Sequence, residues 1–165
     1  MRPRAGQSPA RGRVARRAAI AALLITGVVN MLHYARLIAV GYALWPGHPE
    51  AYRDLQQAAT WADGWMGLMA LAGGMGVWLD RDWGRLLGIV AASALVHMGF
   101  LDVAFHAQHG MYTSLDPVML EMIVVDCWAF GVGASLILYL WSSVGEGLEA
   151  PSNSRLRGGS PKWPE

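Results

Sequence analysis

The chain has 165 residues, of which 54% are hydrophobic and 15% are charged, and its formal net charge is +1 at pH 7. Composition alone would allow a soluble domain, but nearly all of the charged residues lie in the two ends and the short connections, which argues against one. The single cysteine, Cys127, excludes an intrachain disulfide and dithiol redox chemistry.

Four apolar tracts dominate the sequence, at about 18–44, 57–79, 84–107 and 117–142. Each tract is long enough to cross roughly 30 Å of hydrocarbon at about 1.5 Å per residue. Backbone polar groups in lipid must be satisfied within a helix or a closed barrel. The sequence therefore predicts an all-α fold, a transmembrane up-and-down four-helix bundle that occupies residues 18–142.

The remaining segments read as connections and tails. Residues 1–17 carry six arginines and no acidic residue, which predicts a disordered basic arm. The apolar stretch after it has no small-x-small cleavage site, so we expect a retained first helix and no secretory signal. Residues 45–54, with Pro46 and Pro49, are expected to form a loop, residues 80–85 a tight charged turn, and residues 143–165 a flexible tail.

Basic residues are distributed unevenly between the two sets of connections. The N-terminal arm, the 80–85 turn and the C-terminal tail are rich in arginine and lysine, whereas the opposite connections contain only Arg53. By the positive-inside rule, both termini are expected to be cytoplasmic. The basic arm is expected to contact anionic lipid headgroups and not nucleic acid.

Ionisable residues also occur within the apolar tracts. Asp102, His106 and His109 share one helix face because they are spaced by four and three residues, whereas His97 faces another side. Charged groups at membrane depth are costly unless they are paired or hydrated, so they indicate a site. With the predicted orientation, eight such residues fall in the outer half of the bilayer and form a net-acidic pocket: His33, Arg36, Asp63, His97, Asp102, His106, Glu121 and Asp126.

Each of these residues also has a structural interpretation. Arg36 could form an interhelical salt bridge with one of the aspartates. Glu121, His106 and His109 lie near helix ends, where they could simply be solvated at the interface. His97 and Asp126 both approach the midplane and are expected to pair there.

Four functions follow from this pattern. The pocket could bind or pass a proton, a cation or a small ligand, or the chain could be an accessory subunit of a larger membrane complex or a homo-oligomer. The spacing of Asp102, His106 and His109 would permit a bound metal, and His33 and His97 could be the axial ligands of a haem between helices. No HExxH or CxxCH motif is present to support either site. An enzyme that acts on a lipid or quinone would use Asp102 and His106 as acid and base, but no nucleophile motif supports it.

The segments WADGWMGLMALAGGMGVWL, DWGRLLG and LDVAFHAQHGMY, within residues 57–142, carry a resemblance to small four-span membrane proteins of bacteria that have no assigned activity. The resemblance implies a multi-pass protein of the bacterial cytoplasmic (inner) membrane and transfers no catalytic residue. DoxX-like membrane proteins are similar to the chain only in size and span count.

Overall fold

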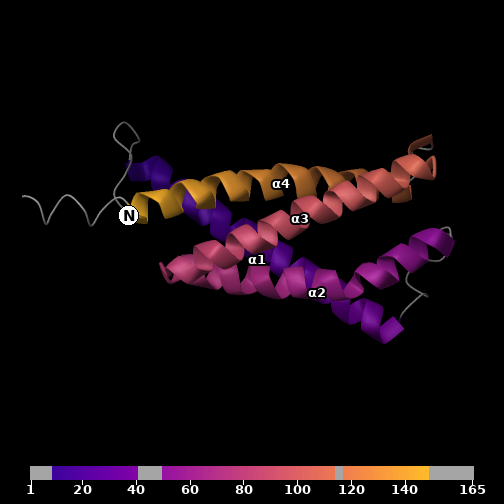
Figure 1. Cartoon of the computed structure of the whole chain (residues 1–165), viewed down its shortest axis with the longest axis horizontal. Helices are drawn as coiled ribbons and strands as arrows, with labels where there is room; N and C mark the ends of the chain where they lie inside the picture. Colours follow the sequence, from indigo (N-terminus) through magenta and orange to yellow (C-terminus); the bar gives the residue numbers. More distant parts are fainter. Residues whose placement is uncertain (1–8, 41–49, 114–116, 149–165) are drawn as a thin grey trace, which may run out of the picture.

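The chain folds into helices that run side by side along one long axis. The computed structural model describes residues 9–40, 50–113 and 117–148. Within these ranges the regular structure is entirely helical, which confirms the predicted all-α class. The elements are α1 (Pro9–Val40), α2 (Glu50–Trp78), α3 (Asp82–Gln108), the short 3-10 helix η2 (Met111–Thr113) and α4 (Pro117–Leu148). Figure 1 shows η2 and the start of α2 at one end of the molecule and the α2–α3 turn at the other.

Three helix boundaries differ from the sequence-based expectation. α1 begins at Pro9, so the part of the basic arm from residue 9 to 17 is helical, and residues 1–8 lie outside the described residues. α2 begins at Glu50, directly after Pro49, and therefore includes residues 50–54 of the expected loop. An acidic residue in the first turn suits the positive end of the helix dipole. α4 continues to Leu148, and the expected tail from residue 149 onward lies outside the described residues.

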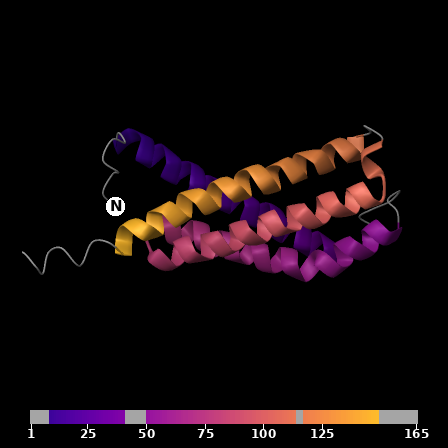
Figure 2. The same ribbon diagram turned by 45° about the horizontal axis from the view of Figure 1, so that its top comes forward.

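Neighbours in sequence are neighbours in space, but the bundle does not close around a common axis. α1 packs along α2, α2 along α3 and α3 along α4, whereas α1 contacts α4 only where the two helices cross. Figure 2 shows this crossing, beyond which α1 and α4 diverge. At the crossing Leu23 packs with Leu136 and Leu140 in the main apolar core. Nearby, the Trp128 indole N–H donates a hydrogen bond to the Thr26 hydroxyl at 3.2 Å.

Glycines allow α2 to approach both of its neighbours closely. A Cβ atom added at Gly73 would lie 2.7 Å from the backbone nitrogen of Gly88 on α3, and one added at Gly76 would overlap the Gly84 backbone. On the other side, a Cβ at Gly74 would lie 2.9 Å from the Leu24 side chain of α1. The small residues of α2, among them Gly74 and Gly76, therefore let it pack closely against both neighbours.

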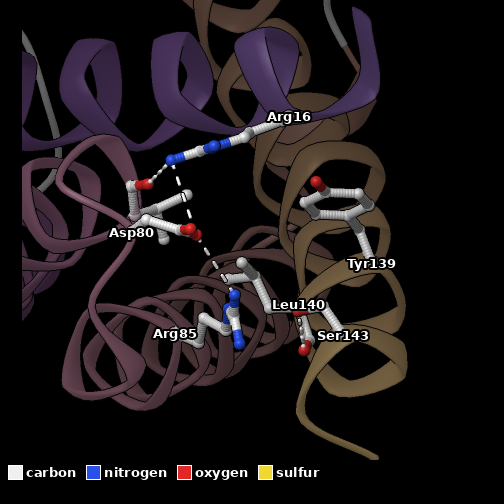
Figure 3. A pocket seen from close by; sticks show the side chains of 7 residues that line it. Arg16, Asp80, Arg85, Tyr139, Leu140 and Ser143 are labelled. Carbon is white, nitrogen blue, oxygen red and sulfur yellow. Dashed lines mark hydrogen bonds and ion pairs between the residues drawn. The ribbon is translucent and has the colours of Figure 1, made fainter. Parts of the chain in front are cut away.

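The tight turn from α2 to α3 is fastened to α1. Asp80 adopts a φ of 56°, and the Asp80 and Arg81 amides donate to the Val77 and Gly76 carbonyls, which completes a Schellman C-cap. Arg16 of α1 donates hydrogen bonds to the carbonyls of Val77 at 2.8 Å and Trp78 at 3.1 Å. Its guanidinium also lies 3.6 Å from the Asp80 carboxylate (Figure 3).

Three of the helices are long and apolar enough to cross a membrane. They are the stretches Gly12–Val40, Asp82–Gln108 and Met119–Ser143, which belong to α1, α3 and α4. α2 is not among them, although four spanning helices were predicted. The physical reason is its polar first half, where Glu50, Arg53, Asp54 and Asp63 come before the apolar second half.

Candidate functional site

Buried polar side chains gather at the η2 end of the molecule. Asp63 of α2 and Asp126 of α4 are each 6% exposed, and His106 of α3 is 2% exposed. A local core of Tyr52, Met119 and Met122 surrounds this group. Burial of ionisable side chains has a free-energy cost, so this group is the first candidate for a functional site.

The centre of the site is the contact between Asp126, Tyr112 and His106. The Tyr112 hydroxyl donates a hydrogen bond to Oδ2 of Asp126 at 2.9 Å. The same hydroxyl lies 3.5 Å from Nδ1 of His106, and that nitrogen lies 3.7 Å from Oδ2 of Asp126. Three elements, α3, η2 and α4, thus meet at one carboxylate oxygen. Gly110, with a φ of 62°, makes the sharp turn that brings η2 back over the end of α3.

The imidazole of His106 is held in place by residues of α2. The Tyr52 ring stacks on it with a centroid separation of 5.7 Å. The Gln56 side-chain amide donates to the Tyr52 hydroxyl at 3.1 Å, and the Thr60 hydroxyl donates to the Gln56 carbonyl at 3.0 Å. This chain of contacts runs down one face of α2 and positions the His106 ring through uncharged side chains.

Two further carboxylates face the same region. Asp102 lies one turn before His106 on α3, and its charge is close enough to act on both Asp126 and Asp63 of α2. The site therefore contains the carboxyl groups of Asp102 and Asp126 near one imidazole, with Asp63 close enough to Asp102 for their charges to interact. Two of these carboxyl oxygens, Oδ1 of Asp102 and Oδ1 of Asp126, are buried and accept no hydrogen bond from the described residues.

An open groove runs beside Asp126 between α3 and α4. It encloses about 450 Å³ and is lined by Val103, Tyr112, Ile123, Asp126, Cys127 and Phe130. This volume lies within the range of roughly 300–1,000 Å³ typical of ligand pockets. The Asp126 carboxyl group and the Tyr112 hydroxyl are the polar groups of an otherwise apolar wall.

Tyr112 lies outside the apolar helical stretches, and its hydroxyl retains its proton at neutral pH. Partial burial, the hydrogen bond to Asp126 and the negative charges of Asp126 and Asp102 raise the pKa of Tyr112 to about 12. A protonated hydroxyl can donate only one hydrogen bond, and that bond goes to Asp126. When its Nδ1 carries the proton, His106 can therefore donate to the Tyr112 oxygen.

Several residues that the sequence placed in the pocket are not part of the buried group. His33 is half-buried on α1, and Arg36 and His97 are exposed. Glu121 is exposed as well, although it lies close enough to Tyr52 for its charge to act on that side chain. Within the described residues, Arg36 forms no ion pair with the aspartates. The expected pairing of His97 with Asp126 is replaced by that of His106. His106 is 2% exposed, so the alternative interpretation of a ring solvated at the interface does not apply to it.

The proposed metal ligands do not converge. His109 is exposed, and its Nδ1 lies 2.9 Å from the Phe105 carbonyl while its ring stacks on Phe105 at 4.0 Å. Across the part of the chain that the structure describes, no group of three histidine, cysteine, aspartate or glutamate side chains could hold a metal ion. Asp102, His106 and His109 are thus near in sequence but do not form a ligand set.

Sequence reasoning missed Tyr52, Gln56 and Tyr112. Tyr52 and Gln56 fell in or beside the expected loop before α2, and Tyr112 fell in the connection after α3. The sequence does contain one signal for Tyr112. Gly110 marks the end of the preceding helix, and a turn at this glycine brings a tyrosine two residues later back toward the end of that helix. No comparable signal exists for Tyr52 unless the start of α2 at Glu50 is known.

The opposite end of the molecule has a second polar cluster, but it leaves no room for a ligand. Arg85 binds Asp80 at 3.3 Å and Asp82 at 2.9 Å, and Arg16 completes the network (Figure 3). The cavity there, lined also by Tyr139 and Ser143, holds about 10 Å³. That is about the volume that one water molecule requires. This cluster fastens α1 to the α2–α3 turn.

Compared with protein-family models, curated proteins and solved structures, the chain gives no match, so its function has to be argued from its own residues.

Proposed function

We propose that the chain is a small integral membrane protein that binds a proton or another cation at the site formed by Asp63, Asp102, His106, Tyr112 and Asp126. The observation that carries the proposal is the charge imbalance of this buried site. Asp102 and Asp126 lie near one imidazole, Asp63 lies close enough to Asp102 for their charges to interact, and two of these carboxyl oxygens accept no hydrogen bond from the described residues. An uncompensated buried charge is costly, so a proton or a bound cation has to balance the excess.

The membrane assignment rests on where the apolar residues face. In the apolar stretches of α1, α3 and α4 only 22%, 28% and 28% of residues are buried inside the chain. Large side chains such as Val124, Leu138 and Trp141 are 67–73% exposed. In water such an apolar surface would favour aggregation. In lipid the same surface is solvated, and helices can pack through small residues, as α2 does with α3.

We infer that α2 is a fourth span despite its polar first half. It lies antiparallel to α3 along its length (Figure 1), and the glycine contacts fix the two helices at the same depth. Its 29 residues extend about 44 Å at 1.5 Å per residue, enough to cross the hydrocarbon. Asp63, its deepest charged residue, faces the site and is shielded from lipid.

The proposed orientation places the site toward the outer leaflet of a bacterial cytoplasmic membrane. Arg13, Arg16, Arg17, Arg81 and Arg85 lie at the end that carries the α2–α3 turn, against Arg36 and Arg53 near the η2 end. The excess of arginine at one end places that end, and with it both termini, in the cytoplasm. The η2 end then faces outward.

Infrared spectroscopy of the protein in lipid nanodiscs tests the proton or cation site. We expect a C=O stretching band of protonated carboxyl groups at neutral pH, weakened in Asp102→Asn and in Asp126→Asn. Glu121→Gln, which alters an exposed carboxylate on α4, is the matched control and should leave the band unchanged. Added methylammonium should reduce the band if a cation replaces the proton. A band that neither aspartate variant changes, with no effect of the cation, contradicts the proposal.

A second candidate is an accessory subunit of a membrane complex or a homo-oligomer. The observation that favours it is the divergence of α1 from α4, which leaves Val28, Val29 and Leu32 of α1 49–61% exposed. Native mass spectrometry of the detergent-extracted protein distinguishes the two. A mass of 17.9 kDa plus bound lipid or ligand supports the independent protein, and a stable multiple supports the subunit.

A further inference from the structure

The groove beside Asp126 has an unusual combination of surfaces. Val103, Ile123 and Phe130 provide an apolar channel along α3 and α4, and a carboxyl group lies in its wall. The Asp126 side chain is only 9% exposed, and its Oδ1 accepts no hydrogen bond within the described residues. A buried acceptor in an apolar wall fits a ligand that brings its own positive charge together with an apolar body.

Three simpler ligands fit this groove less well. A hydrated metal cation needs several oxygen ligands to replace its water, whereas the groove provides a carboxylate and one hydroxyl. An anionic lipid would be repelled by Asp126 and Asp102. A neutral lipid would fill the apolar part but leave the Asp126 acceptor unsatisfied.

We propose that the groove binds an amphiphilic amine, with its ammonium group at Asp126 and its hydrocarbon chain between α3 and α4. An ammonium group donates a charge-assisted hydrogen bond to a carboxylate, and the rings of Tyr112 and Phe130 in the groove wall can stabilise it through cation–π contacts. The groove opens at the side of α3 and α4, where the neighbouring Val124 is 67% exposed, so the ligand reaches it from the lipid. This inference rests on the proposed function and names the class of cation.

The single cysteine provides a reporter inside the groove. Cys127 is exposed and lines the groove next to Asp126. A ligand that fills the groove must therefore slow the alkylation of its thiol by N-ethylmaleimide. Because the chain contains one cysteine, the labelling rate reports on this position alone.

The test uses the full chain in nanodiscs, with N,N-dimethyldodecylamine as probe and dodecan-1-ol as its neutral match. We expect the amine to slow alkylation about tenfold at ten times its dissociation constant, as mass action requires. Dodecan-1-ol should have little effect, and Asp126→Asn should raise the amine concentration needed by about tenfold or more, the equivalent of about 1.4 kcal/mol. Equal protection by the alcohol, protection retained in Asp126→Asn, or no protection by the amine overturns the inference.

A second pair of variants covers the case in which Asp126→Asn does not fold. Ile123→Trp fills the groove, whereas Val124→Trp adds the same side chain one residue away at a position 67% exposed. We expect the amine to raise the thermal unfolding midpoint of the wild type and Val124→Trp but not of Ile123→Trp. An equal rise in both variants contradicts the inference.

The two proposals can fail separately. If the infrared carboxyl band depends on Asp102 and Asp126 but the amine does not protect Cys127, the cation site stands and the ligand class is wrong. If neither the band nor the protection depends on Asp126, the proposed function is wrong as well.

Discussion

Tyr112 is the residue whose chemistry is most directly measurable, because it lies outside the apolar stretches and ionises in an accessible range. Burial and the Asp126 contact raise its pKa to about 12, above the usual value of about 10. The stability that comes from this shift is fully present below about pH 10 and is lost as the pH rises through about 12. We expect the difference in tyrosinate absorbance between the wild type and Tyr112→Phe, followed as the pH is raised, to show a transition near pH 12.

Removing the Asp126 charge tests the cause of that shift. In Asp126→Asn, we expect the Tyr112 transition to move down toward about 10, because the charged acceptor that favours the protonated hydroxyl is gone. The Glu121→Gln variant should leave the transition in place. An unchanged transition in Asp126→Asn would mean that the Tyr112 hydroxyl does not bind this carboxylate.

At the residue scale the sequence predicted which acidic residues belong to the site, but it did not predict which side chains contact one another there. Asp63, Asp102 and Asp126 were identifiable because an ionisable group inside an apolar tract stands out. Which imidazole reaches Asp126 was not identifiable, since helical spacing gives the face of one helix but not its rotation against the next. The contacts of Tyr52 and Tyr112 with His106 depend on where α2 begins and on the turn after α3, and composition determines neither.

The α2–α3 interface depends on the absence of side chains at its glycines. A Cβ at Gly76 would overlap the backbone of Gly84, and backbone cannot rotate away as a side chain can. We expect Gly76→Ala to lower the free energy of unfolding by about 1–3 kcal/mol through overpacking. Gly131→Ala is the control, because no atom lies within 4 Å of its added Cβ. Unfolding by SDS in mixed micelles measures both variants, and equal midpoints would contradict the packing described for this interface.

The attachment of α1 depends on Arg16 more than on its neighbours. Its guanidinium binds two carbonyls at the end of α2, where the helix dipole is negative, and its side chain is 32% exposed. We expect Arg16→Met to lower the unfolding free energy by about 1–2 kcal/mol, somewhat less than a buried charged hydrogen bond. Arg17→Met changes an exposed arginine of the same helix and should have no more than a small effect. The same mixed-micelle titration compares them, and equal losses would show that Arg16 acts only through its charge.

At the element scale the apolar tracts predicted the existence and order of the helices, because hydrophobic length is a strong signal. Their ends were less predictable. α1 extends into the basic arm since arginine is a good helix former, and α2 begins already at Glu50, an acidic residue that suits the positive end of the helix dipole. The open arrangement of α1 and α4 could not be predicted, because it is set by which small residues face which neighbour.

The whole molecule is polarised along its length. The end with the α2–α3 turn has arginines held in ion pairs and a cavity of about 10 Å³, whereas the η2 end has buried carboxylates beside a groove of about 450 Å³. One end is therefore fixed by charge pairs, whereas the other has acidic oxygens that accept no hydrogen bond from the described part of the chain. This asymmetry means that the orientation in the membrane decides from which side the site is reached.

Orientation can be tested with cysteines placed at the two ends in a Cys127→Ala background. Thr113 of η2 is exposed and is expected to face outward, whereas Asp82 at the start of α3, with a side chain 92% exposed, is expected to face the cytoplasm. Loss of the Asp82 contact with Arg85 should be well tolerated, because exposed ion pairs contribute at most about 1 kcal/mol. In intact cells a membrane-impermeant maleimide should label Thr113→Cys, and it should label Asp82→Cys only after permeabilisation. The reverse pattern would place the site on the cytoplasmic side, and labelling of both in intact cells would mean that α2 and α3 do not cross the bilayer as a hairpin.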